Sequence, residues 1–110
     1  MSSYILARKP VEKISINTGV TNITTGAWVQ LSAATTKPLS FMEVYNATTK
    51  ILVLATGVPG SEVELPIYIY PGIGSQIIPI DQIIPKGSRI SAKAVDANAT
   101  TGYLLLNLFV

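Results

Sequence analysis

Glu62 and Glu64 are the best candidates for a catalytic pair of carboxylates in this chain. They lie two residues apart in SEVELPIYIY, so on a β-strand they would share one face at a separation of roughly 7 Å. Carboxylates at about that distance serve as the acid and base of glycoside hydrolases. Solvated strand faces carry the same spacing routinely, and a solvated pair is the interpretation that we favour.

The other common catalytic and metal-binding arrangements are missing from the sequence. The chain has no His and no Cys, which excludes Ser–His–Asp and Cys–His nucleophiles, disulfides and thiolate zinc sites. No serine has a lysine three residues later, as the Ser-x-x-Lys arrangement requires. The acids form no Asp-x-Asp pattern, and no glycine-rich loop precedes a helical pattern. The sequence therefore predicts a protein that is not an enzyme and uses no cofactor or metal.

The composition indicates a protein that is covered by other protein. The 110 residues form one domain on length alone, and 48% of them are hydrophobic. Only 13% are charged, against about 25% in an ordinary soluble domain. Because charge keeps a free monomer soluble, this shortage suggests that much of the surface is buried in an assembly.

Nucleic acid and membrane are not expected as partners. The net charge is +2, and the basic cluster of Arg8, Lys9 and Lys13 has no interleaved aromatic residues. No apolar run approaches the ~20 residues that span a bilayer, and none suits a signal peptide. We therefore expect a soluble protein made in the cytoplasm, and we interpret the Asn-x-Thr triplets at Asn22, Asn46 and Asn98 as turn chemistry.

Short β-branched and aromatic runs, separated by clusters of Gly, Pro, Asn and Thr, predict an all-β fold. Even spacing of about eight short strands is typical of a sandwich or barrel. We predict a single-domain antiparallel β-sandwich, jelly-roll-like, over residues 11–110, with an N-terminal arm at 1–10. The sequence leaves an immunoglobulin-like arrangement of the strands open. The predicted strands are 11–16, 27–33, 39–46, 50–55, 62–70, 75–80, 88–95 and 103–110.

The positions of proline and leucine indicate which of these strands lie at the edge of a sheet and which lie at its centre. Pro66 and Pro79 lie inside strand-like runs and cannot donate to a ladder, so their strands should be at an edge or carry a bulge. The run 103–110 (YLLLNLFV) is apolar on both faces. Such a run suits a central strand, or a strand whose second face is closed by another subunit.

Alternation along two predicted strands separates core-facing from outward side chains. The core-facing set is Val63, Leu65, Ile67, Ile69, Ile90, Ala92 and Ala94. The outward set is Glu62, Glu64, Tyr68, Tyr70, Arg89, Ser91 and Lys93.

The outward set has several possible roles. Tyr68 and Tyr70 beside carboxylates could stack on a sugar, anchor a protein partner, or lie half-buried at a sheet rim. Arg89 and Lys93 could meet the acids of a neighbouring subunit in a ring and fix its register, or could simply be solvated. The single tryptophan, Trp28, is favoured as a core residue, although its pairing with Gln30 on one face leaves a binding role open.

Four stretches of the chain resemble small virion proteins of tailed bacteriophages. They are TNITTGAWVQL, GVPGSEVELPIYIYPG, IPKGSRISAKA and GYLLLNLFV, and the resemblance covers residues 20–110. It implies a capsid decoration (cement) protein, typically a homotrimer on the capsid surface, which binds the major capsid protein lattice and stabilises the head. A neck, baseplate or fibre component and a carbohydrate-binding module are the alternatives. The arm with Arg8 and Lys9 would lie along a partner; no family binding residue is carried over to this chain.

Overall fold

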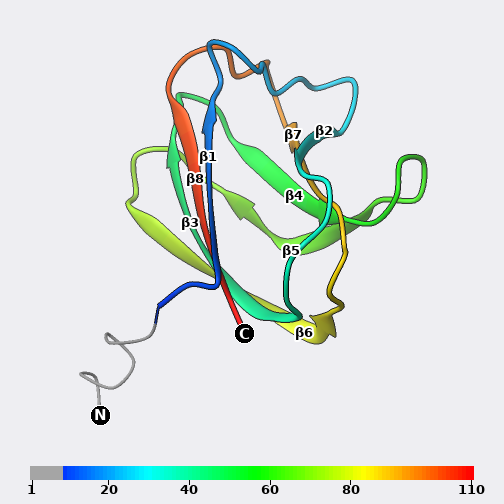
Figure 1. Ribbon diagram of the computed structural model, residues 1–110. Helices are drawn as coiled ribbons and strands as arrows, with labels where there is room; N and C mark the ends of the chain where they lie inside the picture. Colours follow the sequence, from blue (N-terminus) through cyan, green and yellow to red (C-terminus); the bar gives the residue numbers. More distant parts are fainter. Residues whose placement is uncertain (1–8) are drawn as a thin grey trace.

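The computed structural model describes residues 9–110, which contain eight strands and no helix (Figure 1). The strands are β1 (Glu12–Asn17), β2 (Val29–Ser32), β3 (Leu39–Ala47), β4 (Leu52–Thr56), β5 (Val63–Ile69), β6 (Ser75–Ile84), β7 (Ile90–Ala94) and β8 (Tyr103–Phe109).

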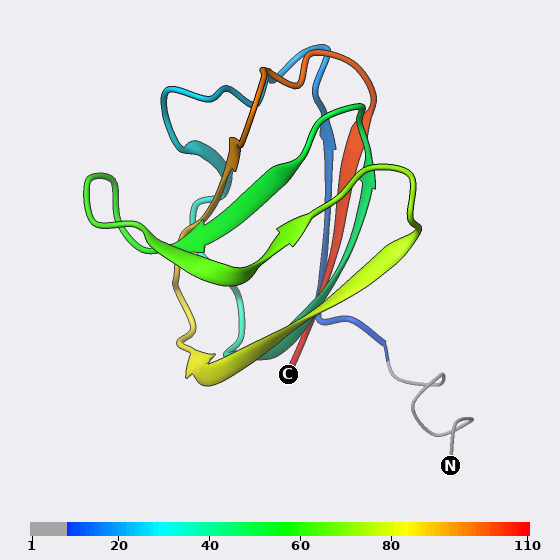
Figure 2. The ribbon, with the colours of Figure 1, turned by 180° about the vertical axis from the view of Figure 1, so that it is seen from behind.

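The strands form two four-stranded antiparallel sheets that lie face to face (Figures 1 and 2). Sheet 1 has the order β1-β8-β3-β6, and sheet 2 has the order β2-β7-β4-β5. Eight strands in two interleaved sheets of this order make a jelly roll. The predicted all-β, jelly-roll-like sandwich is therefore confirmed.

The topology follows from a single long ribbon of paired chain. β1 pairs with β8, β2 with β7, β3 with β6 and β4 with β5, all antiparallel. The hairpin β4–β5 is the tip of this ribbon, and successive pairs alternate between sheet 1 and sheet 2. Rolling the ribbon in this way closes the apolar faces of both sheets over one core.

All eight strands contribute side chains, mostly at alternate positions, to the core between the sheets. Fully burying a Leu or Ile stabilises the fold by roughly 1.5–3 kcal/mol. The largest side chains that are fully buried are Ile23, Leu39, Met42, Val44, Leu52, Leu54, Ile69, Ile78, Ile90, Leu104, Leu106 and Leu108.

Most strand predictions agree with the structure. Every predicted boundary lies within two residues of the observed one, except that β6 continues to Ile84 rather than ending at residue 80. Pro66 lies on β5 and Pro79 on β6, which are edge strands whose pairing shifts in register next to each proline. β8 lies between β1 and β3, as its two apolar faces predicted.

The prediction that Val63 is a core residue of β5 is wrong. Its side chain is 66% exposed rather than buried. The residue begins an edge strand and borders a groove between β5 and β6, where Ile83 is equally exposed. Sheet 1 does not cover this end of the strand, so alternation alone does not bury it.

Only part of the predicted N-terminal arm can be placed. Lys9 is exposed and Pro10 is half-buried just before β1. The Val11 amide donates to the Leu108 carbonyl at 2.8 Å, which joins the start of the domain to β8. Arg8 and the residues before it lie outside the described part of the chain.

Candidate functional site

The outward side chains of β1, β8, β3 and β6 form what we call the sheet-1 outer face. Because Leu104, Leu106 and Leu108 are buried in the core, the residues between them on β8 must point away from it. The exposed fractions are 48% for Tyr103 and 38% for Leu105. The exposed face of an antiparallel sheet normally carries polar side chains, so this face is unusual.

Neighbouring strands continue the apolar surface around Leu105. On β3, Tyr45 pairs with Leu105 and is 41% exposed. On β6, Ile77 pairs with Glu43 and is 55% exposed. Large apolar side chains from three adjacent strands therefore lie together and open to solvent, which is the mark of an interaction surface.

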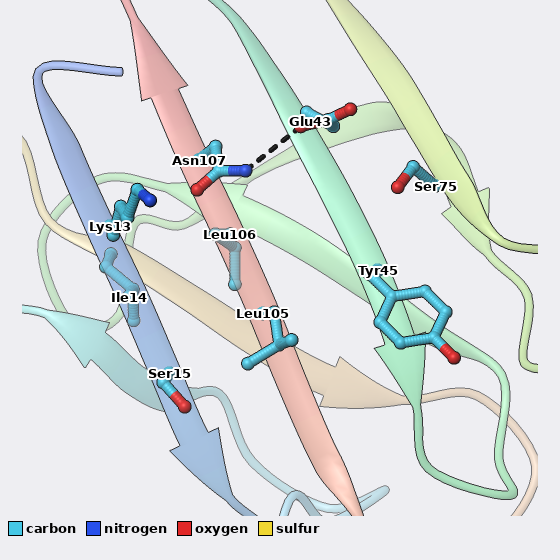
Figure 3. Close-up of a pocket in the computed structure, with 9 residues that line it drawn as sticks. All are labelled: Lys13, Ile14, Ser15, Glu43, Tyr45, Ser75, Leu105, Leu106 and Asn107. Carbon is cyan, nitrogen blue, oxygen red and sulfur yellow. Dashed lines mark hydrogen bonds between the residues drawn. The ribbon is translucent and has the colours of Figure 1, made fainter. Parts of the chain in front are cut away.

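A polar row crosses the middle of the sheet-1 outer face. Lys13 on β1 pairs with Asn107 on β8, and Asn107 pairs with Glu43 on β3. The Asn107 Nδ2 donates to the Glu43 Oε1 at 3.0 Å (Figure 3). Lys13 lies exposed on the other side of Asn107 and makes no ion pair with any residue whose side chain the structure describes. The row thus carries one positive and one negative end.

The next row contains a hollow. Ser15, Leu105 and Tyr45 pair in order across β1, β8 and β3, and Figure 3 shows Leu105 between the other two. A hollow of about 440 Å³ extends across this row. Its lining runs from Ser15 on β1 past Leu105 and Tyr45 to Ser75 on β6, and also includes Lys13, Glu43 and Asn107. Because the two serines are small, the face is lower on either side of the two bulky residues.

The two ends of the sheet-1 outer face are aromatic. The rings of Phe41 and Phe109 stack with centroids 4.5 Å apart and an interplanar angle of 5°. At the other end, the Asn17 Nδ2 donates to the Tyr103 hydroxyl at 3.4 Å. The face therefore combines rigid aromatic side chains with very few charges, a composition enriched at the centres of protein interfaces.

The residues that the sequence singled out lie mainly on the other face of the molecule, along sheet 2. The Arg89 Nη1 lies 3.0 Å from the Glu62 Oε2, and both side chains are only 11% exposed. Arg89 also donates through Nε to the Gln30 Oε1 at 3.0 Å and through Nη1 to the Gly57 carbonyl at 3.4 Å. The expected pairing of Arg89 with a neighbour's acid is instead an ion pair within one chain.

Several contacts hold the Glu62 carboxylate in its charged form and lower its pKa from the ordinary value of 4.5. The largest is a hydrogen bond from the backbone of Glu62 itself. Desolvation opposes the change, whereas Arg89 and the Gly60 amide, at 3.1 Å, favour it. A carboxylate with these partners is a structural anion and lacks the raised pKa of a general acid.

Trp28 is not a core residue, which corrects the favoured prediction. It is half-buried beside β7, and the Lys93 Nζ lies 4.6 Å from the centre of its ring. The outward alternation that Trp28 shares with Gln30 puts the indole on the solvent side of sheet 2. Such a cation–π contact contributes about 0.5–1 kcal/mol at an exposed site.

The centre of the outer face of sheet 2 is lined by small side chains. Ser91 on β7 pairs with Ala55 on β4, and Lys93 pairs with Val53. Ser91, Ala55 and Val53 are buried although the core lies on the opposite side of the sheet. The Ser91 Oγ has no hydrogen-bond partner among the described residues.

The remaining predicted residues stay separate. Tyr68 and Tyr70 are 44% and 45% exposed on and just after the edge strand β5. Glu64 is exposed and makes no ion pair within the described chain. Lys9 comes just before β1, which is a strand of sheet 1, and so lies away from the predicted residues of sheet 2. These side chains do not converge on one site.

The sheet-1 outer face as a whole was missed by the sequence reasoning. The two apolar faces of 103–110 were a correct signal for its centre. No local pattern indicated that Tyr45 and Ile77 lie beside this strand, because cross-strand register depends on residues far apart in the chain.

The described residues contain no group of three or more side chains that could hold a metal ion. Nor do they contain a helix long and apolar enough to cross a membrane. A comparison of the chain with protein-family models and with curated proteins found no match.

Proposed function

We propose that this protein is a structural component of a tailed-bacteriophage virion, of the capsid decoration (cement) kind. In this role it binds the lattice of the major capsid protein on the head surface and stabilises the head without catalysing a reaction. The observation that carries the proposal is the exposed apolar sheet-1 outer face, with Tyr45, Ile77, Tyr103 and Leu105. The resemblance to small virion proteins supports the phage setting.

The character of this face supports an assembly role. Exposed aromatic and aliphatic side chains stabilise a complex by about 25 cal/mol for each Å² of apolar area that the partner covers. Tyrosine is also enriched among the residues that dominate binding energy. The rigid jelly roll holds these side chains in place before binding, which lowers the entropy cost of association.

The carbohydrate-binding alternative has weaker support. It needs Glu62 and Glu64 as acceptors for sugar hydroxyls beside Tyr68 and Tyr70. Because Glu62 is held by Arg89 within the chain, its carboxylate is already engaged. The exposed tyrosines alone do not form a sugar site.

Co-sedimentation with undecorated heads tests the proposal. Purified protein is mixed with expanded, undecorated heads of the phage whose genome encodes the chain, and the heads are pelleted. We expect saturable binding at a stoichiometry set by the capsid lattice, and heads that withstand higher temperature. Protein that stays in the supernatant at all concentrations would contradict the decoration role.

A second measurement places the protein within the virion. Heads and tails of purified virions are separated and analysed by mass spectrometry. We expect the chain in the head fraction at many copies per particle. Recovery in the tail fraction at low copy number would instead favour the neck, baseplate or fibre alternative.

A further inference from the structure

We infer that a second copy of this chain covers the sheet-1 outer face, related to the first by a two-fold axis that runs parallel to β8. The inference rests on the proposed structural role and deepens it: the sheet-1 outer face joins two copies, and the pair then meets the capsid through another part of its surface. Three features support it: the order of the strands, the charged row and the hollow beside Ser15.

The strand order makes the face suited to pairing with itself. β8 is flanked by β1 and β3, at equal spacings of about 4.8 Å. A two-fold axis along β8, in the plane between two copies, keeps each row at its height and exchanges its two sides. Every β1 residue of one copy then faces the β3 residue of the same row in the other copy, as an isologous interface requires.

The polar row becomes complementary under this operation. Lys13 and Glu43 lie in one row on opposite sides of Asn107. The axis therefore places Lys13 of each copy opposite Glu43 of the other, so two ion pairs form by symmetry. Lys13, which has no ion-pair partner in the described part of its own chain, gains one.

The next row is complementary in size. Here the same axis places Tyr45 of one copy opposite Ser15 of the other, since both pair with Leu105. Ser15 borders the hollow of about 440 Å³, and Tyr45 is large and 41% exposed. Each tyrosine thus enters the hollow of the other copy, and the two Leu105 side chains meet at the axis.

Sheet geometry allows this contact. Sheets pack face to face about 10 Å apart, with mean strand directions within about 30° of each other. An axis along β8 keeps the two β8 strands parallel, and the twist of each sheet turns the flanking strands relative to the strands that they face. The rows of Leu105 and Asn107 lie near the middle of β8, where this rotation displaces facing residues least. A three-fold arrangement would instead bring the face against a different surface and would lose the reciprocal pairing of Lys13 with Glu43.

The area available sets the strength of the pair. An axis on β8 overlaps three strands of each copy, β1, β8 and β3, and leaves β6 outside the contact. Three strands about 4.8 Å apart and about seven residues long give a footprint of roughly 350 Å² per copy. The total of roughly 700 Å² is below the about 1,000 Å² of a stable specific interface and lies in the range of weak, transient contacts. We therefore expect a dimer that dissociates on dilution rather than a permanent one.

The solution mass across a dilution series is the first test. Sedimentation equilibrium of the full chain should give twice the monomer mass of 11.7 kDa at high concentration and a fall towards the monomer on dilution. A monomer at every concentration up to the millimolar range would overturn the inference. A trimer whose mass is unaffected by the variants below would also overturn it.

Charge reversal tests the row directly. Lys13→Glu places acids opposite acids, and Glu43→Lys places bases opposite bases. Each variant should raise the dissociation constant roughly tenfold or more, because like charges then face each other in both symmetric pairs. Lys86→Glu, in the exposed turn after β6, makes the same change in charge away from the face and should leave the constant unchanged.

Mixing the two reversed variants gives the decisive result. Each acid-rich copy then faces a base-rich copy, so an equimolar mixture should recover the mass of a dimer. Recovery also shows that both variants are folded. If the mixture stays as weakly associated as its components, Lys13 does not face Glu43 and the two-fold arrangement is wrong.

These tests are independent of the proposed function. Head binding by the reversed variants, measured by the same co-sedimentation, reports on the capsid contact alone. A wild-type dimer that does not bind heads would leave the pairing intact and remove the decoration role. A monomer that binds heads would do the opposite.

Discussion

Arg89 and Lys93 are both used within their own chain. Arg89 joins three segments, through Gln30 on β2, the Gly57 carbonyl after β4 and Glu62 before β5. Lys93 lies over the Trp28 ring. Both basic side chains, Arg89 just before β7 and Lys93 on it, are therefore engaged in contacts at the outer face of sheet 2 within one chain.

The lowered pKa of Glu62 predicts a pH dependence. A carboxyl whose pKa is lower in the folded state stabilises the fold fully above its ordinary pKa of 4.5. That stabilisation is lost as the pH falls through the lower folded value. We expect the free energy of unfolding, measured with urea, to fall below pH 4.5 more steeply in the wild type than in Glu62→Gln.

Glu64→Gln is the matched control for this measurement. Glu64 is exposed and makes no ion pair with any described residue, so its loss should leave the pH profile almost unchanged. If Glu62→Gln and the wild type have parallel profiles between pH 3 and about 5, the contacts of Glu62 do not stabilise its charge.

Ser91 predicts a substitution that stabilises the protein. Its Oγ is buried and has no hydrogen-bond partner among the described residues, so folding costs the hydroxyl its hydration without compensation. Ser91→Ala should raise the free energy of unfolding by about 1 kcal/mol. Urea denaturation measures the change, and a destabilised variant would mean that the hydroxyl has a partner.

At the scale of strands and turns, Gly102 fixes the entry to β8. Its φ is +88°, and a Cβ there would collide with the Ala47 carbonyl. Its own carbonyl accepts the amide and the hydroxyl of Thr18, each at 2.9 Å. The turn before β8 thus packs against the ends of β1 and β3 with no room for a side chain.

We therefore expect Gly102→Ala to lower the free energy of unfolding by about 2–4 kcal/mol, through both the left-handed conformation and the collision. Gly74→Ala separates the two causes, because Gly74 has a φ of +81° with open space around it; it should cost about 1 kcal/mol. Thermal unfolding would measure both. Equal losses would show that the collision relaxes freely.

Most elements could be predicted because their signals are local. The runs that became β3 and β8 show alternation or apolarity within a few residues, and Pro66 and Pro79 mark edge strands through a missing donor. Val63 was placed wrongly because the other sheet decides whether the end of an edge strand is covered. For Trp28 the local alternation with Gln30 indicated the outward position, but the preference of a lone tryptophan for the core outweighed it in the prediction.

The candidate site could not be predicted because it is a product of register. Lys13, Glu43 and Asn107 are far apart in the sequence and become one row only when β1 and β3 pair on either side of β8. The charges in 62–70 and 88–95 were the predicted interface residues, and they lie on the opposite side of the molecule, along sheet 2. Composition predicted an assembly, which stays a prediction, and it did not locate a surface.

The whole molecule has two unlike faces. On sheet 2, Arg89 and Lys93 have partners within the chain, and the small side chains Ser91, Ala55 and Val53 are buried. On sheet 1, apolar side chains are exposed to solvent, and Lys13 in the polar row makes no ion pair with a described residue. This division suits the proposed assembly through the sheet-1 outer face.

The rolled ribbon also sets an order for folding. The hairpin β4–β5 joins strands that are adjacent in the chain, whereas β1 pairs with β8 alone, and Lys13 meets Asn107. Folding is slow because the entropy cost of closing the long loop between β1 and β8 comes before the contacts between these strands can stabilise the chain. During synthesis β1 cannot pair until β8 has emerged from the ribosome. Until then the apolar residues of β1 are exposed to solvent and to other chains. The nascent protein is therefore most vulnerable to aggregation just before its final strand is made.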